Sequence, residues 1–347
     1  MRITKTKSLQ NNDVYSRPAI GTTILSFGII LLLGSIVLSI SVGAANIDFG
    51  TVWRAIFAYD STRETDQIIV SIRFPREMGA AMVGAAFAVS GAIMQGMTRN
   101  PLADPGLLGL NSGASLALAV VFAFGTGASF LSVMLISFIG AGLGAVMVFG
   151  LGSLSRGGMT PLRITLAGAA VSSLLLALSE GIALFFNLSQ DLTFWANGGV
   201  SGTSWLQLKI VVPVVAAGIL AAVMLSKGLT ILSFGEEVAK GLGQRTLLTK
   251  AVLMTVVLIL AGAAVSLVGP IAFVGLMVPH IVRYLVGTDY RWIIPCSAVF
   301  GSILMVLADT AARMVNAPFE TPVGAIVSLV GFPFFLYLAR KRGRKLA

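Results

Sequence analysis

Long apolar runs separated by short polar segments are the feature that most constrains how this chain folds. About ten runs reach the roughly 20 residues that a helix needs to cross the hydrocarbon core of a bilayer. Of the 347 residues, 56% are hydrophobic and only 11% are charged, whereas a soluble domain carries roughly 25% charged residues. The sequence therefore predicts an all-α polytopic membrane protein with about ten transmembrane helices.

The predicted spans form one transmembrane domain at residues 20–339, between a polar, basic tail at 1–19 and a basic tail at 340–347. They lie near residues 20–42, 70–96, 106–125, 130–151, 163–187, 206–226, 248–268, 270–286, 292–312 and 322–339. Gly269-Pro270 and Pro279 interrupt the eighth, so a short or broken helix is expected there. The first run is longer than the core of roughly 7–15 residues in a signal peptide, which favours an uncleaved helix.

The distribution of basic residues predicts the orientation. An even number of spans places both termini on one side of the membrane. Most of the 24 lysine and arginine residues fall in the tails and in the loops on that side, and cytoplasmic loops carry such an excess. Both termini are therefore predicted to be cytoplasmic, together with the loop at 233–245.

A weak internal echo points to an inverted repeat. The pattern Gly84-Ala85-Ala86-(x)4-Gly91-x-Ile93 returns as Gly262-Ala263-Ala264-(x)4-Gly269-x-Ile271. The copies lie in the second and seventh spans, an odd number of crossings apart, so they cross the membrane in opposite directions. Inverted repeats are common in transporters, although a chance match between two Gly-Ala-rich helices is the alternative.

Residues for catalysis or metal binding are missing from the sequence. It contains no G-x-x-x-x-G-K-S/T phosphate loop and no H-E-x-x-H motif. His280 is the only histidine and Cys296 the only cysteine, so neither a metal site nor an intrachain disulfide is predicted. His280 is expected to bond at a helix end, and Cys296 to pack as a small apolar residue. The residues therefore give no support for a membrane-embedded enzyme.

The most conspicuous polar interruption is the stretch from Ser233 to Arg245. It predicts a short helix, with Ser233 as the N-cap, acidic residues in the first turn and glycines at the end. Between two spans, such a helix lies near the bilayer surface, where a soluble partner can grip it. An ordinary connecting loop is the alternative.

Three further features are candidates for function. Arg73, Arg76 and Arg313 lie on the outer side, against the positive-inside bias, and arginine suits carboxylates. They either dock a partner protein or pair locally, Arg76 with Glu77 or Asp66 and Arg313 with Asp309. The segment from Thr98 to Gly109, with two prolines, predicts a rigid cytoplasmic turn. Glu180 is a charged residue within a span, which makes it a candidate for a cavity or for a local pair.

Several of these blocks occur in the same order in one known family. They are Arg73-Phe74-Pro75-Arg76, Gly84 to Gln95, Asn100-Pro101-Leu102-Ala103-Asp104-Pro105-Gly106-Leu107-Leu108-Gly109, Gly235 to Gly243, Gly269 to Arg283, and Ala308-Asp309-x-x-Ala312-Arg313. On these blocks the chain resembles the FecCD-type permeases, the membrane subunits of ABC importers for iron-siderophores, haem and vitamin B12.

The resemblance implies a role for each block. The loop at 232–247 contains a coupling helix that engages the ATPase, through Gly235, Glu236, Glu237, Ala239, Gly241 and Gly243. Arg73, Arg76 and Arg313 would dock the solute-binding protein. The cytoplasmic turn, with Asn100, Pro101, Asp104, Pro105 and Gly106, would lie close to the gate. The family provides no role for Glu180.

The resemblance also implies partners and a location. These are a cytoplasmic pair of ATPase subunits, an extracytoplasmic solute-binding protein and a second permease, either identical or related, in a bacterial plasma membrane. The chain itself would bind no cofactor, since ATP and magnesium belong to the ATPase. The expected cargo is an iron-siderophore complex, with vitamin B12 or haem as alternatives. A secondary transporter driven by an ion gradient is the alternative of a different class.

Overall fold

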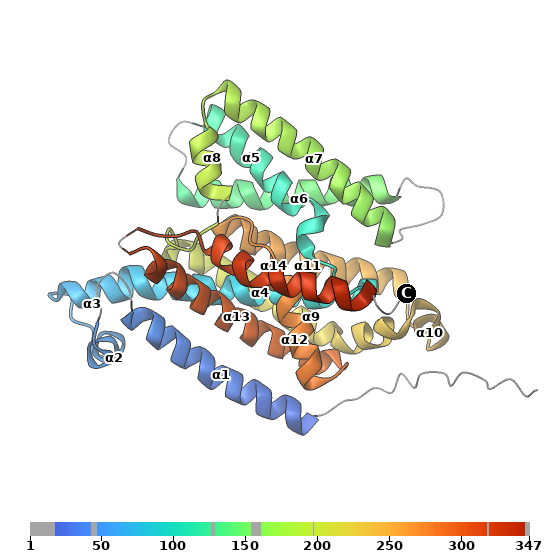
Figure 1. Ribbon diagram of the computed structural model, residues 1–347, viewed down its shortest axis with the longest axis horizontal. Helices are drawn as coiled ribbons and strands as arrows, with labels where there is room; N and C mark the ends of the chain where they lie inside the picture. The colour runs from blue at the N-terminus through green and yellow to red at the C-terminus, as the bar shows by residue number, and fades with distance from the viewer. Residues whose placement is uncertain are drawn as a thin grey trace, which may run out of the picture.

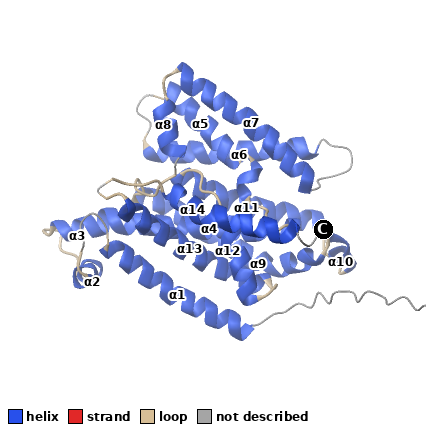
Figure 2. Cartoon of the chain, in the orientation of Figure 1, coloured by secondary structure: helices blue, strands red, loops and turns tan. Residues whose placement is uncertain are grey.

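The computed structural model describes residues 18–42, 47–125, 129–153, 161–196, 198–317 and 319–343. These residues form helices joined by loops, with no β-sheet among them (Figure 2). The elements are α1 (Pro18–Ser41), α2 (Phe49–Phe57), α3 (Glu64–Ile68), η1 (Ile69–Arg73), α4 (Phe74–Thr98), η2 (Pro105–Leu108), α5 (Leu110–Phe124), α6 (Phe130–Ser153), α7 (Pro161–Phe185), α8 (Ser189–Ala196), α9 (Trp205–Phe234), α10 (Glu236–Gly241), α11 (Thr246–Val268), α12 (Val274–Val286), α13 (Tyr290–Val315) and α14 (Val323–Gly343).

Every predicted span coincides with a helix. In the described part of the chain, seven helices are long and apolar enough to cross a membrane, and α5, α12 and most of α14 are shorter apolar helices. The short helices α2, α3 and α8 were not predicted. The start of α1, α10 and the last turns of α14 lie at one end of the bundle, while α2 and α3 lie at the other (Figure 1).

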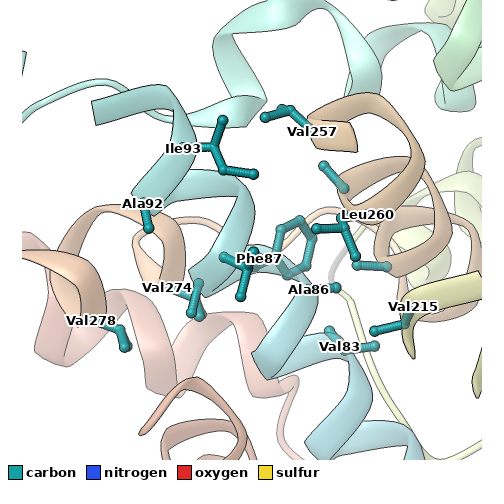
Figure 3. Packing of buried hydrophobic residues seen from close by; sticks show 14 of the residues in the cluster. Val83, Ala86, Phe87, Ala92, Ile93, Val215, Val257, Leu260, Val274 and Val278 are labelled. Carbon is teal, nitrogen blue, oxygen red and sulfur yellow. The ribbon is translucent and has the colours of Figure 1, made fainter. Parts of the chain in front are cut away.

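Helix α4 is the centre of the packing. It contacts α9, α11, α12 and α13, and nearly all of its residues from Gly79 to Gly96 are buried. Its apolar side chains, Phe87 among them, meet side chains of α9, α11 and α12 (Figure 3). Helices α5, α6 and α7 form a second group with α8, and α6 joins this group to α11 (Figure 1).

Glycine permits the two closest contacts of α4. A Cβ atom at Gly84 would lie 2.1 Å from the carbonyl oxygen of Gly301 in α13. At Gly91, a Cβ atom would lie 1.8 Å from the carbonyl oxygen of Gly275 in α12. Small residues that let backbones approach closely are typical of packed membrane helices. The absence of a side chain at Gly84 and Gly91 therefore lets α4 approach the backbones of α13 and α12.

The helix contacts are consistent with an inverted repeat. In the first half, α5 packs on α6 and α7 and α4 packs on α13; in the second half, α12 packs on α13 and α14 and α11 packs on α6. The two copies of the glycine pattern nevertheless have different surroundings, because Gly91 lies within α4 while Gly269 is the C-cap of α11. The repeat stays a prediction, supported by the pairing of the helices.

The prediction of a short or broken eighth helix is confirmed. Helix α12 has 13 residues and follows an irregular segment after Gly269. Its N-cap, Phe273, has a φ of 69°, which is a strained conformation for a bulky residue. Because Gly275 lies against Gly91, α12 begins beside the middle of α4 and not at its end.

Candidate functional site

The polar stretch at 232–247 contains the predicted short helix, but its start differs from the prediction. Ser233 is not the N-cap, because α9 continues to Phe234 and the Ser233 hydroxyl donates to the carbonyl oxygen of Thr230 at 2.6 Å. The N-cap is Gly235, whose φ of 138° suits glycine. Helix α10 then runs to Gly241, so the end is close to the predicted one.

Glu236 fixes α10 to the start of α11. Its carboxylate pairs with Lys240 at 3.3 Å and with Lys250, and it accepts a hydrogen bond from Thr246 at 3.4 Å. The hydrogen bond from Lys250 is the main cause that lowers the pKa of Glu236 below the usual glutamate range. Gln244 adds a second connection, since its amide donates to the carbonyl oxygen of Gly228 in α9 at 3.1 Å.

Apolar side chains are exposed on α10 and at the start of α11. Leu242 is 68% exposed and Leu247 is 79% exposed, with the half-exposed Val238 beside the charged Glu237. Ala239 instead is buried. Exposed apolar side chains with charged neighbours, at the bundle end that also holds the start of α1, are compatible with contact to a soluble protein.

The predicted cytoplasmic turn connects α4 to α5. Arg99 ends α4 in the left-handed conformation, with a φ of 52°. The Asn100 carboxamide accepts from the backbone N–H of Leu102 at 3.2 Å, and the Asp104 carboxylate accepts from that of Gly106 at 2.8 Å. These local bonds hold the backbone in a tight turn. Burial raises the pKa of Asp104 to about 6, and the hydrogen bond from Gly106 opposes this shift.

The same turn lies against the start of α12. A Cβ atom at Gly275 would come within 3.2 Å of Pro105 and 3.4 Å of the Asp104 carboxylate. Next to this contact, the Gln95 amide donates to the carbonyl oxygens of Gly275 and Leu276 at 3.2 and 3.0 Å. No role was predicted for Gln95, although a buried glutamine in a span is a signal for an interhelical bond. Pro101 and Gly106 are half-buried in the turn.

At the opposite end, the arginines form an ion-pair network. The Arg76 guanidinium contacts the Asp309 carboxylate through Nε and Nη2, both at 2.9 Å, and contacts Glu320 at 2.5 Å. Arg313 contacts Glu77 at 2.6 Å and Asp309 at 3.2 Å. Arg76 is 8% exposed, while Asp309 and Glu77 are fully buried. Glu320 is the accessible member, with a side chain 49% exposed.

The expected local partners are therefore correct for Arg313 and wrong for Arg76. Arg313 pairs with Asp309 at helical spacing, but Arg76 reaches across to α13 instead of pairing with Glu77 or Asp66. Asp66 pairs with Arg54 at 3.3 Å. The network also holds the end of α1, because Arg73 donates to the carbonyl oxygen of Ile40 and Arg313 donates to the Ser39 hydroxyl.

The remaining candidates are spread over the bundle. Glu180 lies exposed on α7 and is not buried in this chain. The His280 ring packs edge-on to Phe334 of α14, with ring centroids 5.8 Å apart. Cys296 is fully buried in the core, as predicted. Within the described residues, no group of three or more His, Cys, Asp and Glu side chains is placed to hold a metal ion.

Comparisons with known proteins agree on one family. The model of the FecCD transport family matches residues 30–341. The iron(3+)-hydroxamate import system permease protein FhuB of Bacillus subtilis is 54% identical over 323 residues, which cover 93% of this chain and 84% of that protein. The hemin transport system permease protein HmuU of Yersinia pestis is 37% identical over 322 residues, covering 90% of this chain and 94% of that protein. A solved inward-facing structure of a metal-chelate type ABC transporter has a TM-score of 0.80 and 27% identity, covering 92% of this chain and 99% of that one.

Proposed function

The chain belongs to the FecCD transport family, and from this premise we propose that it is the permease of an importer for ferric siderophores of the hydroxamate class. It is a multi-pass membrane subunit that translocates its cargo and does no chemistry on it. The hydroxamate permease shares 54% of aligned residues with this chain, against 37% for the hemin permease. Both alignments cover nearly the whole chain, so this difference in identity favours a ferric hydroxamate as the cargo. Haem is the second candidate.

In this proposal the work is divided among several proteins. A cytoplasmic ATPase pair binds ATP and magnesium, a second permease chain completes the passage, and an extracytoplasmic binding protein delivers the ferric complex. Both termini and α10 face the cytoplasm of a bacterial cell. The exposed apolar surface at Val238, Leu242 and Leu247 supports α10 as the contact with the ATPase. ATP binding would move α10, and the permease pair would alternate between outward-open and inward-open cavities.

The proposed function is tested by uptake. A strain that lacks its own permease should accumulate a radiolabelled ferric hydroxamate when it carries this chain. In proteoliposomes, transport by the assembled importer should require hydrolysable ATP. The double substitution Glu236→Ala with Gly241→Leu should reduce uptake by at least about tenfold, the effect of losing roughly 1.4 kcal/mol of coupling energy. The reason is that the first change frees α10 from Lys250 and the second adds a bulky side chain at its exposed end.

A matched control is Gly142→Leu, because Gly142 lies in α6 with nothing within 4 Å of its Cβ position. This variant should transport normally, and all variants should be present in the membrane in equal amounts. Uptake that survives the double substitution and follows a proton or sodium gradient would establish the secondary transporter instead. Uptake of haem but not of the hydroxamate would replace the cargo.

We propose further that the binding protein docks at the outer end of the bundle through Arg73, Arg76 and Arg313. The network balances its arginines against buried carboxylates, so an incoming carboxylate would reach Arg76 by replacing the accessible Glu320. Arg73 lies at the junction of η1 and α4, and its guanidinium donates to the carbonyl oxygen of Ile40 in α1. Its substitution tests docking while Arg76 keeps its two carboxylate partners, Asp309 and Glu320.

Arg73→Glu should weaken association with the binding protein, and the loss should shrink as salt is added, because screening removes the charge repulsion. Arg63→Glu is the control, since Arg63 is an exposed arginine at the same end of the bundle, paired with Asp60 at 3.1 Å. Affinity is measured with the purified permease in nanodiscs at low and high ionic strength. Equal affinities for the two variants would remove Arg73 from the docking surface.

A further inference from the structure

Tyr290 is a buried aromatic residue that the proposed function does not use. It is the first residue of α13 and is 2% exposed. Its neighbours come from three other helices, α4, α9 and α12, at the bundle end that also carries α10. Tyr290 therefore contacts three helices besides its own.

The backbone of Tyr290 is attached to α9. The first N–H groups of a helix have no partner within the helix and need other acceptors. Asp289 accepts from the backbone N–H of Arg291 at 3.0 Å, and the Thr230 hydroxyl of α9 accepts from that of Tyr290 at 3.0 Å. The same hydroxyl donates to the carbonyl oxygen of Ser226 at 2.9 Å, so its orientation is fixed.

The side chain of Tyr290 is attached to α4 and α12. A Cβ atom at Gly96 would lie 2.6 Å from the Tyr290 hydroxyl and 2.9 Å from Leu229, so the phenol fills a slot that only glycine leaves open. The Arg283 guanidinium of α12 donates to the Tyr290 hydroxyl at 2.7 Å. Its Cζ also lies 5.6 Å from the centre of the ring, within the range of a cation–π contact.

Two of these helices, α9 and α4, end within a few residues of their contact with Tyr290, and each leads into a segment of the candidate site. Four residues after Thr230, α9 ends, and Gly235 leads into α10. Three residues after Gly96 comes Arg99, which begins the turn at residues 99–109. These two segments also lie close together, since Nη1 of Arg99 is 3.5 Å from the position that a Cβ atom at Gly235 would take.

We propose that Tyr290 is the positioning residue that passes movement of α10 to the turn at residues 99–109. A displacement of α9 moves the backbone of Tyr290 through Thr230. The phenol, held by Arg283, then moves the end of α4 at Gly96. This inference rests on the proposed role of α10 as the contact with the ATPase, and it goes beyond that role by naming the residue that connects α10 to the turn.

Tyr290→Phe tests the inference, because it keeps the ring in its slot and removes only the hydroxyl that Arg283 holds. The permease is reconstituted in proteoliposomes with its ATPase and binding protein, and both ATP hydrolysed and ferric hydroxamate transported are measured. The ratio of transport to hydrolysis should fall on the order of threefold, the effect of one hydrogen bond of ordinary strength. ATP hydrolysis and the melting temperature should stay close to those of the unchanged protein.

The matched control is Tyr284→Phe, since Tyr284 belongs to the same helix as Arg283 but is 89% exposed; its ratio should not change. A ratio for Tyr290→Phe equal to that of the unchanged protein overturns the inference and leaves the role of α10 intact. A large drop in melting temperature together with lost hydrolysis also overturns it, because Tyr290 would then be structural only. Absence of any bound ATPase on the unchanged chain overturns the role of α10 itself.

Discussion

Gly91→Ala should lower the stability of the purified protein sharply, or prevent its accumulation in the membrane. The added Cβ atom would lie 1.8 Å from the carbonyl oxygen of Gly275 and 2.4 Å from its Cα atom. Both are backbone atoms, which no rotamer change can move away. Overpacking of this kind costs about 1–3 kcal/mol or more, and here it separates α4 from the start of α12.

Two alanine substitutions provide the comparison. Gly275→Ala places a Cβ atom 2.9 Å from the carbonyl oxygen of Phe87, a milder contact, and Gly142→Ala meets nothing within 4 Å. Melting temperatures, measured by fluorescence-detected size-exclusion chromatography, should therefore rank Gly142→Ala highest, Gly275→Ala next and Gly91→Ala lowest. Alanine at Gly142 should equal or exceed the unchanged protein, since glycine within a helix is about 1 kcal/mol less favourable than alanine. Any other order would contradict the close backbone contact.

The second large effect is expected from Asp309→Ala. This carboxylate has no exposed surface; it accepts two hydrogen bonds from Arg76 and forms an ion pair with Arg313 at 3.2 Å. Its removal leaves both guanidinium groups buried with one fewer countercharge. Removing one partner of a buried ion pair typically costs about 3–5 kcal/mol, so unfolding at much lower temperature is expected.

Arg63→Ala is the matched control, because it breaks an ion pair with Asp60 in which both side chains are well exposed. Exposed pairs contribute little to stability, so the melting temperature of this variant should not change measurably. Glu320→Gln should lie between the two, since Glu320 contacts Arg76 from an accessible position. A melting temperature of Asp309→Ala equal to that of Arg63→Ala would show that the network does not hold α1, α4 and α13 together.

The sequence predicted the local parts of the candidate sites well. The stretch of acids and glycines after α9 predicted the helix α10, and the prolines of residues 100–109 predicted the rigid turn. Both are properties of adjacent residues. The N-cap at Ser233 was wrong because the apolar face of α9 continues to Phe234, and packing of a longer helix outweighs the preference of serine for a cap.

Contacts between distant residues were beyond the sequence. Arg76 has nearby acids in Glu77 and Asp66, and local spacing favours them. The structure instead pairs Arg76 with Asp309, 233 positions away, because α4 and α13 cross closely at Gly84 and Gly301 and bring these two side chains together. Nothing in the neighbourhood of Arg76 indicates this crossing.

The sequence by itself determined that this is a helical membrane protein, where its spans lie and to which family it belongs. Hydropathy and helix signals act over one or two turns, so a single chain segment contains them. Only the tertiary structure decided which glycine faces which backbone, which carboxylate neutralises Arg76, and that Tyr290 joins four helices at one point. These depend on how complete helices pack, and a helix of apolar residues presents similar surfaces on several sides until its neighbours select one.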